Sequence, residues 1–216
     1  PPLMVLIPAA FVGLAMALPL AYLIIRGFGA SSEAWELLFR MRTAQILGRS
    51  ALLVVIVTGA SLMIAAPLAW LTTRTDMPFR RTLSVLTALP LVVPSYVGAF
   101  LAISALGPKG LVQQILSPVG VDKLPEFYGL PGAAITLTLL SYPYILLTVR
   151  AALRNLDPSL DESARILGHG PWSAMYRTTL PQLRPAMAAG SLLVALYTLA
   201  DFGAVSLMRY ETFTWA

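Results

Sequence analysis

Five long apolar stretches limit the folds that this chain can adopt. They cover residues 3–25, 51–71, 83–103, 132–149 and 186–208. None contains a lysine or an arginine, and only the last contains an acid, Asp201. About 20 apolar residues cross a bilayer as a helix. Because the stretches lack the alternation of a membrane barrel, they predict an all-α bundle with about five membrane-spanning helices.

The composition agrees with a membrane protein. Charged residues make up 12% of the 216 residues, whereas a soluble domain carries about 25%. The formal net charge is +5, but the arginines are scattered between the apolar stretches, which argues against nucleic-acid binding. The absence of cysteine excludes disulfides and thiolate metal sites. We expect residues 1–216 to form a single transmembrane domain in a lipid bilayer.

The segments between the stretches differ in character. Residues 26–50 mix aromatic and charged side chains, as an amphipathic helix at a membrane interface does. Residues 72–82 are short and basic, and residues 104–131 are rich in glycine and proline, with a short helix expected near 112–116. Lysine and arginine are divided almost equally between the two sides of the predicted bundle. The positive-inside rule therefore does not orient the chain.

A polar interval, residues 155–185, separates the fourth and fifth stretches. Asp157 is typical of a helix start and Gly168 of a helix stop. A second short helix is expected to follow and to end at Pro181 and Pro185. The pattern predicts a helix–turn–helix elbow that both flanking stretches hold close to the membrane.

This interval resembles the coupling motif of ABC-importer permeases: E-A-A, three residues, G, nine residues, an aliphatic residue, any residue and L-P. The chain reads Glu162-Ser163-Ala164, then Gly168, then Thr178-Thr179-Leu180-Pro181, with the spacing intact and with departures at Ser163 and Thr178. The resemblance implies that the interval docks on a separate ATP-hydrolysing subunit. It assigns this contact to Asp161, Glu162, Ser163, Ala164, Arg165, Gly168, His169, Leu180 and Pro181. An amphipathic helix on the lipid surface is the alternative, but it has no need of this spacing.

Residues 93–100, 141–144, 200–205 and 209–214 are similar to the ferric-iron branch of these permeases. The resemblance implies the type I importer fold in a bacterial inner membrane, with the interval in the cytoplasm. It also implies the first half of a longer two-half permease, with the sixth span missing. The implied partners are two ATP-binding cassette subunits, a second permease half and a periplasmic substrate-binding protein. ATP and Mg would be bound by those cassette subunits, since this chain has no Walker-type loop. No cofactor, metal or catalytic residue is expected in the chain itself.

Prolines and polar groups inside the apolar stretches are the candidates for a translocation pathway or gate. Prolines kink membrane helices, and an acid in a membrane core is a functional candidate. For Asp201 the alternative is a structural hydrogen bond that caps a helix break before Gly203. The candidate set is Pro94, Ser95, Tyr96, Tyr142, Pro143, Tyr144 and Asp201.

These features predict the permease of an ATP-driven importer, with ferric iron as the first choice of substrate. Thiamine or an oxyanion such as sulfate is the alternative substrate. An ion-coupled secondary transporter would use intramembrane charges, and one acid in five stretches is few. An intramembrane hydrolase would need a base beside a nucleophile, but the only histidine, His169, lies outside the stretches. A membrane anchor without transport activity is a third alternative.

Overall fold

The computed structural model describes residues 3–29, 36, 39–108, 110–117, 127–157, 166, 168, 170, 173 and 175–215. These residues form helices and connecting turns, without strands. Within them, five helical segments are long and apolar enough to cross a membrane. The predicted all-α architecture is therefore confirmed. The chain divides into two units, residues 1–45 and residues 46–216.

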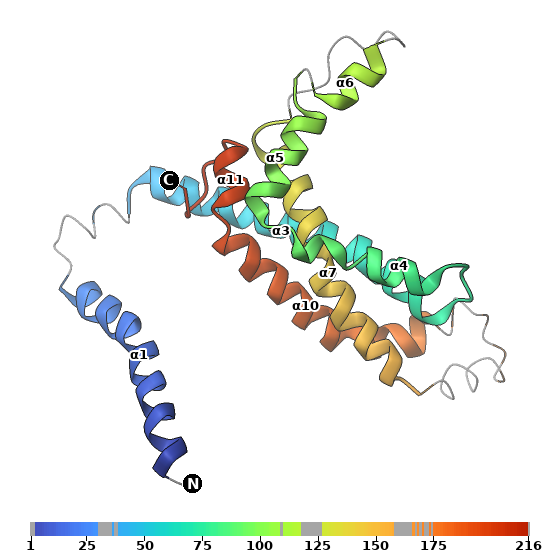
Figure 1. The fold of residues 1–216 in the computed structure, drawn as a ribbon, viewed down its shortest axis with the longest axis horizontal. Helices are drawn as coiled ribbons and strands as arrows, with labels where there is room; N and C mark the ends of the chain where they lie inside the picture. The colour runs from blue at the N-terminus through green and yellow to red at the C-terminus, as the bar shows by residue number, and fades with distance from the viewer. Residues whose placement is uncertain are drawn as a thin grey trace. The chain divides into compact units, whose positions relative to one another are not determined.

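The long helix of the first unit is α1 (Leu3–Phe28), coloured blue in Figure 1. At 1.5 Å per residue, its 26 residues extend for about 39 Å, more than the thickness of a hydrocarbon core. The Arg26 guanidinium lies 5.7 Å from the centre of the Tyr22 ring, so this charge contacts an aromatic side chain near the end of the helix. These bounds agree with the first predicted span.

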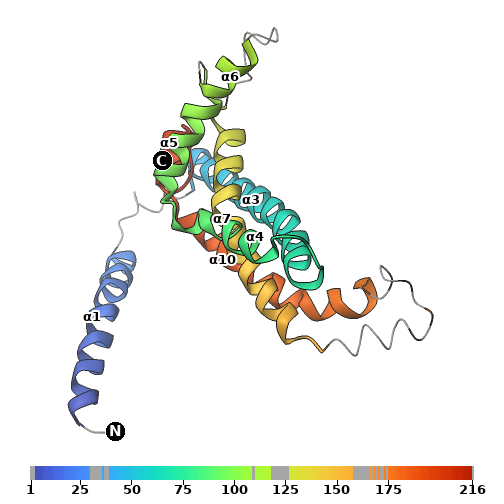
Figure 2. The ribbon, with the colours of Figure 1, turned by 45° about the vertical axis from the view of Figure 1, so that its right-hand side comes forward.

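Four helices form most of the second unit (Figures 1 and 2). They are α3 (Met41–Arg74), α5 (Ser95–Leu106), α7 (Leu130–Asn155) and α10 (Leu180–Ala200). The central helix is α7, in which 15 of 26 residues are buried and which contacts both α5 and α10. In α3 only seven of 34 residues are buried, and they fall every three or four positions along one stripe. A helix with one buried stripe leaves its other faces to lipid or to partner proteins.

Small residues allow these helices to approach closely. Ser61 of α3 and Ser141 of α7 are buried, and their hydroxyl oxygens lie 3.4 Å apart. At Gly190 of α10, an added Cβ would lie 2.8 Å from the Cα of Ile145 in α7. Real Cβ contacts are never that short, so glycine is required where the two backbones meet. Such contacts between small residues are the usual way in which membrane helices pack.

The third predicted span, residues 83–103, is not one helix. The chain instead forms α4 (Arg80–Leu86), the 3₁₀-helix η1 (Leu89–Val92) and then α5. Pro90 and Pro94 explain the interruptions, because proline donates no backbone hydrogen bond and the residue before it disfavours the helical conformation. The membrane-length segment in this region runs from Ser95 to Leu116. Its last part is α6 (Leu111–Leu116), which confirms the short helix expected near 112–116.

The predicted ends of three other elements are also wrong. Residues 41–50, expected in an interfacial segment, belong to α3. The π-helix η3 (Met175–Thr179) continues directly into α10, so Pro181 and Pro185 do not end a helix. Pro181 lies in the first turn of α10, where its missing N–H is not needed. The last predicted span, residues 186–208, breaks after α10 and resumes as the short helix α11 (Gly203–Leu207).

Candidate functional site

The polar interval joins α7 to η3 and α10, but the structure describes only part of it. Six predicted contact residues lie outside the described residues: Asp161, Glu162, Ser163, Ala164, Arg165 and His169. Ile166 is helical and Gly168 follows in a turn with φ of 85°. Glycine adopts this left-handed conformation without strain and commonly occupies it where a helix ends. No described atom lies within 4 Å of a Cβ placed on Gly168.

Leu180 and Pro181, the other described members of the motif, form the first turn of α10. They follow the π-helical turn directly, and both side chains are partly exposed. The two ends of the motif therefore differ in secondary structure. Gly168 lies in a turn of the interval, whereas Leu180-Pro181 belongs to a helix that continues into the bundle.

Arg74, the last residue of α3, holds the end of α7. Its Nη2 donates to the carbonyl oxygens of Leu153, at 2.9 Å, and Leu156, at 3.1 Å. The last carbonyls of a helix have no partner within the helix, and a positive charge there also favours the helix dipole. Arg74 therefore binds the end of α7, from which the polar interval continues.

Arg150 makes a second link at the same end of the bundle. It lies in α7, one turn before the helix ends, and only 7% of it is exposed. Its Nη1 donates to the carbonyl of Ser84, at 3.0 Å, and its Nη2 to the Thr87 hydroxyl, at 3.2 Å. These acceptors lie at the end of α4, so Arg150 joins α4 to α7. Neither arginine was a candidate from the sequence, where the only signal is their position at the ends of apolar stretches.

Four of the predicted pathway residues lie close together near the opposite end of the bundle. A Cβ added to Gly203 would lie 2.9 Å from the Ser95 hydroxyl and 3.0 Å from the Tyr96 Cβ. The ring of Tyr144 lies 5.5 Å from that of Tyr197, centre to centre. The Tyr197 phenol in turn interacts with Ser95, Tyr144 and Asp201. Residues from α5, α7 and α10 thus meet at the break after α10, and Tyr197 is a member that the predicted set did not include.

The remaining pathway candidates have other positions. Tyr142 and Pro143 are buried in the core of α7, with Tyr142 only 8% exposed. Pro94 is exposed and precedes the first turn of α5. Along the chain, Pro94 directly precedes Ser95, and Tyr142 and Pro143 directly precede Tyr144, so these three residues adjoin members of the Ser95, Tyr96, Tyr144 and Asp201 group in sequence.

The Asp201 carboxylate caps the short helix α11. Its Oδ1 accepts hydrogen bonds from the backbone N–H groups of Ala204, at 2.8 Å, and Val205, at 3.4 Å. The Asp201 carbonyl accepts another from the Thr214 hydroxyl, at 2.6 Å. Measured from Leu180, 21 residues at 1.5 Å place Asp201 about 30 Å along the helix, roughly one hydrocarbon thickness away. These contacts are those expected of the structural alternative, in which Asp201 caps a helix break.

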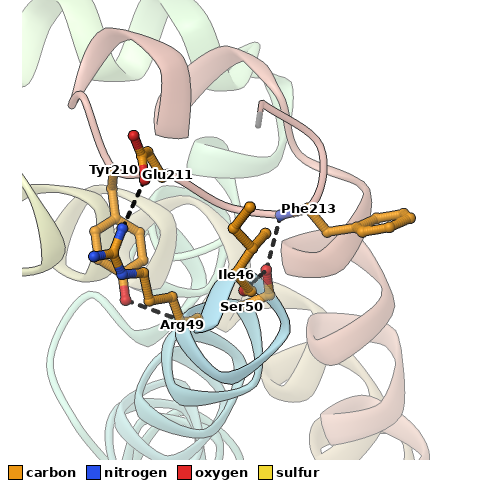
Figure 3. Close-up of polar contacts among 6 residues, drawn as sticks. All are labelled: Ile46, Arg49, Ser50, Tyr210, Glu211 and Phe213. Atoms are coloured by element: carbon orange, nitrogen blue, oxygen red, sulfur yellow. Dashed lines mark hydrogen bonds and ion pairs between the residues drawn. The ribbon is translucent and has the colours of Figure 1, made fainter. Parts of the chain in front are cut away.

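The segment after α11 is fastened to the first part of α3 (Figure 3). Arg49 Nη1 lies 2.7 Å from Glu211 Oε2, and the Tyr210 hydroxyl donates to the Arg49 carbonyl at 3.2 Å. The Phe213 N–H donates to the Ser50 hydroxyl at 2.9 Å, and that hydroxyl donates to the Ile46 carbonyl. Burial raises the pKa of the Tyr210 phenol, and Arg49 opposes this shift. Residues 46–50 therefore hold the segment that follows the Asp201 break.

Comparisons with known proteins agree with this architecture. A crystal structure of a bacterial alginate ABC transporter, in complex with an alginate-bound periplasmic protein, contains a chain of the same fold. The TM-score is 0.67 at 16% identity, and the match covers 98% of this chain and 83% of that one. This likeness shows the fold alone.

Two curated relatives are transport-system permeases. The Fe(3+)-transport system permease protein FbpB 2 of Haemophilus influenzae is 34% identical over 217 residues, which is all of this chain and 39% of that protein. The molybdenum transport system permease protein ModB of Escherichia coli K12 is 30% identical over 63% of this chain and 58% of that protein. The chain thus spans about two fifths to three fifths of these relatives. A family model matches residues 61–211, and the chain belongs to that family, the binding-protein-dependent transport system inner membrane components.

Proposed function

We propose that this chain is a permease subunit of an ATP-driven importer and that residues 155–185 receive the force of a partner ATPase. The observation that carries the proposal is the motif spacing of this interval in a member of this family, with Gly168 at φ of 85°. A glycine with a positive φ makes a tight turn, whose backbone can approach another protein closely. The interval would lie in the cytoplasm and would contact one of two cassette subunits, which bind ATP and Mg.

The two helices beside the interval can pass on its displacement. On one side is α7, whose end is held by Arg74 and which is joined to α4 by Arg150. On the other side, η3 continues without a break into α10. Because α7 and α10 meet backbone to backbone at Gly190, a movement of one is resisted by the other. We infer that the two helices tilt together when the ATPase subunits close.

At the far end, this tilt reaches the break between α10 and α11. There Ser95 and Tyr96 contact Gly203, and Tyr197 lies beside Asp201. We infer that this region is the gate of an alternating-access cycle, opposite the polar interval. A second permease half would complete the pathway, and a periplasmic binding protein would deliver the substrate to this side.

Ferric iron is the proposed substrate. The supporting observation is the match of the whole chain to a permease named for Fe(3+) transport. The molybdenum permease matches at a similar identity but over less of the chain, so an oxyanion is the second candidate. Uptake of labelled ferric iron, molybdate, sulfate and thiamine by proteoliposomes with the whole transporter would separate these substrates. ATP-dependent uptake of molybdate or sulfate, with none of iron, would contradict the iron proposal.

The coupling proposal is tested by two substitutions at Gly168 in the assembled transporter. Asparagine tolerates a positive φ, so Gly168→Asn should keep most uptake. Gly168→Trp places a bulky, β-substituted side chain at this positive-φ position and blocks close approach of a partner, so it should abolish both uptake and stimulation of the ATPase. Membrane insertion of both variants should equal that of the wild type. If Gly168→Trp transports normally, this turn does not contact the ATPase.

A further inference from the structure

A basic hollow of about 450 Å³ lies where α3 ends, α4 begins and α7 ends. Its lining combines three guanidinium groups with three hydroxyls, and among the described residues no carboxylate lines it. The lining residues are Thr72, Thr73, Arg80, Arg81, Ser84 and Arg154. Such a set presents hydrogen-bond donors and positive charge toward one small space, the chemistry that binds phosphate.

Among the described residues, no ion pair balances the positive charge of this region. Arg74 and Arg150 lie nearby and are hydrogen-bonded to carbonyl and hydroxyl oxygens rather than to carboxylates. Arg80, Arg81 and Arg154 form no ion pair within the described part of the chain, where the one ion pair lies at the other end of α3. The charge of Arg154 also acts unfavourably on Arg150, one turn away. A bound anion would relieve this repulsion.

Two described acids are close to this group in sequence. Asp76 lines a neighbouring depression together with Arg80 and Arg81, and Asp157 follows the end of α7. Among the described residues, Arg74, Arg80, Arg81, Arg150 and Arg154 against these two acids give a net charge of +3.

One hydroxyl in the lining is without a partner. The Thr73 Oγ1 atom is buried and makes no hydrogen bond within the described residues. A buried polar atom that lacks a partner destabilises the fold unless a ligand or water satisfies it. Because Thr73 lines the hollow, rotation of its side chain about χ1 would bring this hydroxyl to an oxyanion bound there.

The surroundings of the hollow are apolar and exposed, which points to a lipid rather than to a soluble anion. Val85 and Leu86 of α4 are 63% and 51% exposed, and Phe79, directly before α4, is 81% exposed. With 34 and 26 residues, α3 and α7 are longer than a bilayer core is thick, so their ends reach the headgroup region. Basic pockets between membrane helices at this depth are typical sites for anionic headgroups.

We propose that this hollow binds the phosphate group of an anionic phospholipid from the leaflet on the side of the polar interval. Arg80, Arg81 and Arg154 contact the phosphate oxygens, Thr73 donates its hydroxyl, and the acyl chains lie along the exposed apolar side chains of α4. Because Arg150 and Arg74 fix α4 and the end of α7 beside the hollow, a bound lipid steadies the point where the polar interval begins. The site does not depend on which substrate is transported.

Native mass spectrometry of the assembled transporter tests the proposal, with phosphatidylglycerol and phosphatidylcholine as probes. The hollow variant, Arg80→Gln/Arg81→Gln, removes two of the proposed phosphate contacts. The matched control is Arg177→Gln/Arg184→Gln, because these exposed arginines lie toward the same end of the bundle but do not line the hollow. Phosphatidylglycerol should bind the hollow variant about 30-fold more weakly, from the usual strength of two basic residues near an anionic surface. The control should bind like the wild type, and phosphatidylcholine should be lost from all three proteins.

Three results would overturn the proposal. One is equal retention of the two lipids by the wild type, a measurement that does not depend on the folding of any variant. Another is displacement of phosphatidylglycerol from the wild type by millimolar inorganic phosphate, which would identify free phosphate as the ligand. The third is a hollow variant that keeps the lipid but loses its ATPase subunit on gel filtration, because the arginines would then contact acids of that protein.

Discussion

Alanine substitution should change stability in opposite directions at two glycines, one inside the contact between α7 and α10 and one outside it. Gly190 lies in α10, where an added Cβ would be 2.8 Å from the Cα of Ile145 and even closer to the Thr148 hydroxyl. Carbon atoms pack best at about 3.5–4.0 Å. To accept alanine, the two helices must therefore separate by roughly 1 Å.

The magnitude follows from two opposing terms. Alanine improves helix propensity over glycine by about 1 kcal/mol, whereas overpacking a tight contact costs about 1–3 kcal/mol. At Gly190 the packing term dominates, and Gly190→Ala should destabilise the protein by up to about 2 kcal/mol. The control is Gly59 of α3, where no described atom lies within 4 Å of an added Cβ. Gly59→Ala should therefore be neutral or stabilising by up to about 1 kcal/mol.

Thermal unfolding of the purified protein in detergent measures the difference. A change of 1 kcal/mol shifts Tm by about 2–4 °C in a domain of this size. We expect Gly190→Ala to lower Tm by several degrees and Gly59→Ala to leave it unchanged or raised. Gly190→Leu should be worse than Gly190→Ala, because the larger side chain cannot move away from the α7 backbone. If Gly190→Ala raises Tm as much as Gly59→Ala, the helices do not meet at this glycine.

Three further predictions concern polar contacts. Arg74→Met removes both hydrogen bonds to the end of α7, worth about 1.5–3 kcal/mol each at most. Amide hydrogen exchange around Leu156 should become faster, and unchanged exchange would show that Arg74 does not stabilise the end of α7. Asp201→Ala should lower the free energy of unfolding by about 1 kcal/mol, whereas Asp201→Asn keeps a side-chain acceptor and should lower it less. Equal losses would show that the carboxylate does not stabilise the protein by capping α11. Glu211→Gln should change stability by less than about 1 kcal/mol, because its ion pair with Arg49 is about half exposed, and a larger loss would show a buried network.

Most of the helical architecture could be predicted from local pattern. Apolar length and the absence of charge locate α1, α3, α7 and α10, since each hydrophobic run must be covered by lipid or by protein. The boundaries were less predictable. The mixed aromatic and charged residues of 26–50 suggested an interfacial segment, yet residues 41–50 belong to α3, which extends beyond its apolar part. Hydrophobicity marks the portion of a helix that is in lipid and not its ends.

Predictions that rested on prolines were wrong in two ways: one predicted helix is broken, and one predicted helix end is absent. Pro90 and Pro94 break the third segment into separate helices, although kinks within one span were expected. Pro181 and Pro185 do not end a helix, although a stop was expected. The consequence of a proline depends on whether neighbouring turns can change to 3₁₀ or π geometry, and this depends on tertiary packing.

The sequence by itself determined that the chain is a helical membrane protein and that residues 155–185 follow the coupling pattern, because hydrophobic length and motif spacing are local properties. The tertiary structure alone decided which distant residues meet. Arg74 reaches carbonyls 79 and 82 positions away, and Asp201 finds its partners only because the chain breaks after α10. Such contacts join side chains to backbone groups, which every residue carries, so no sequence pattern identifies the acceptor.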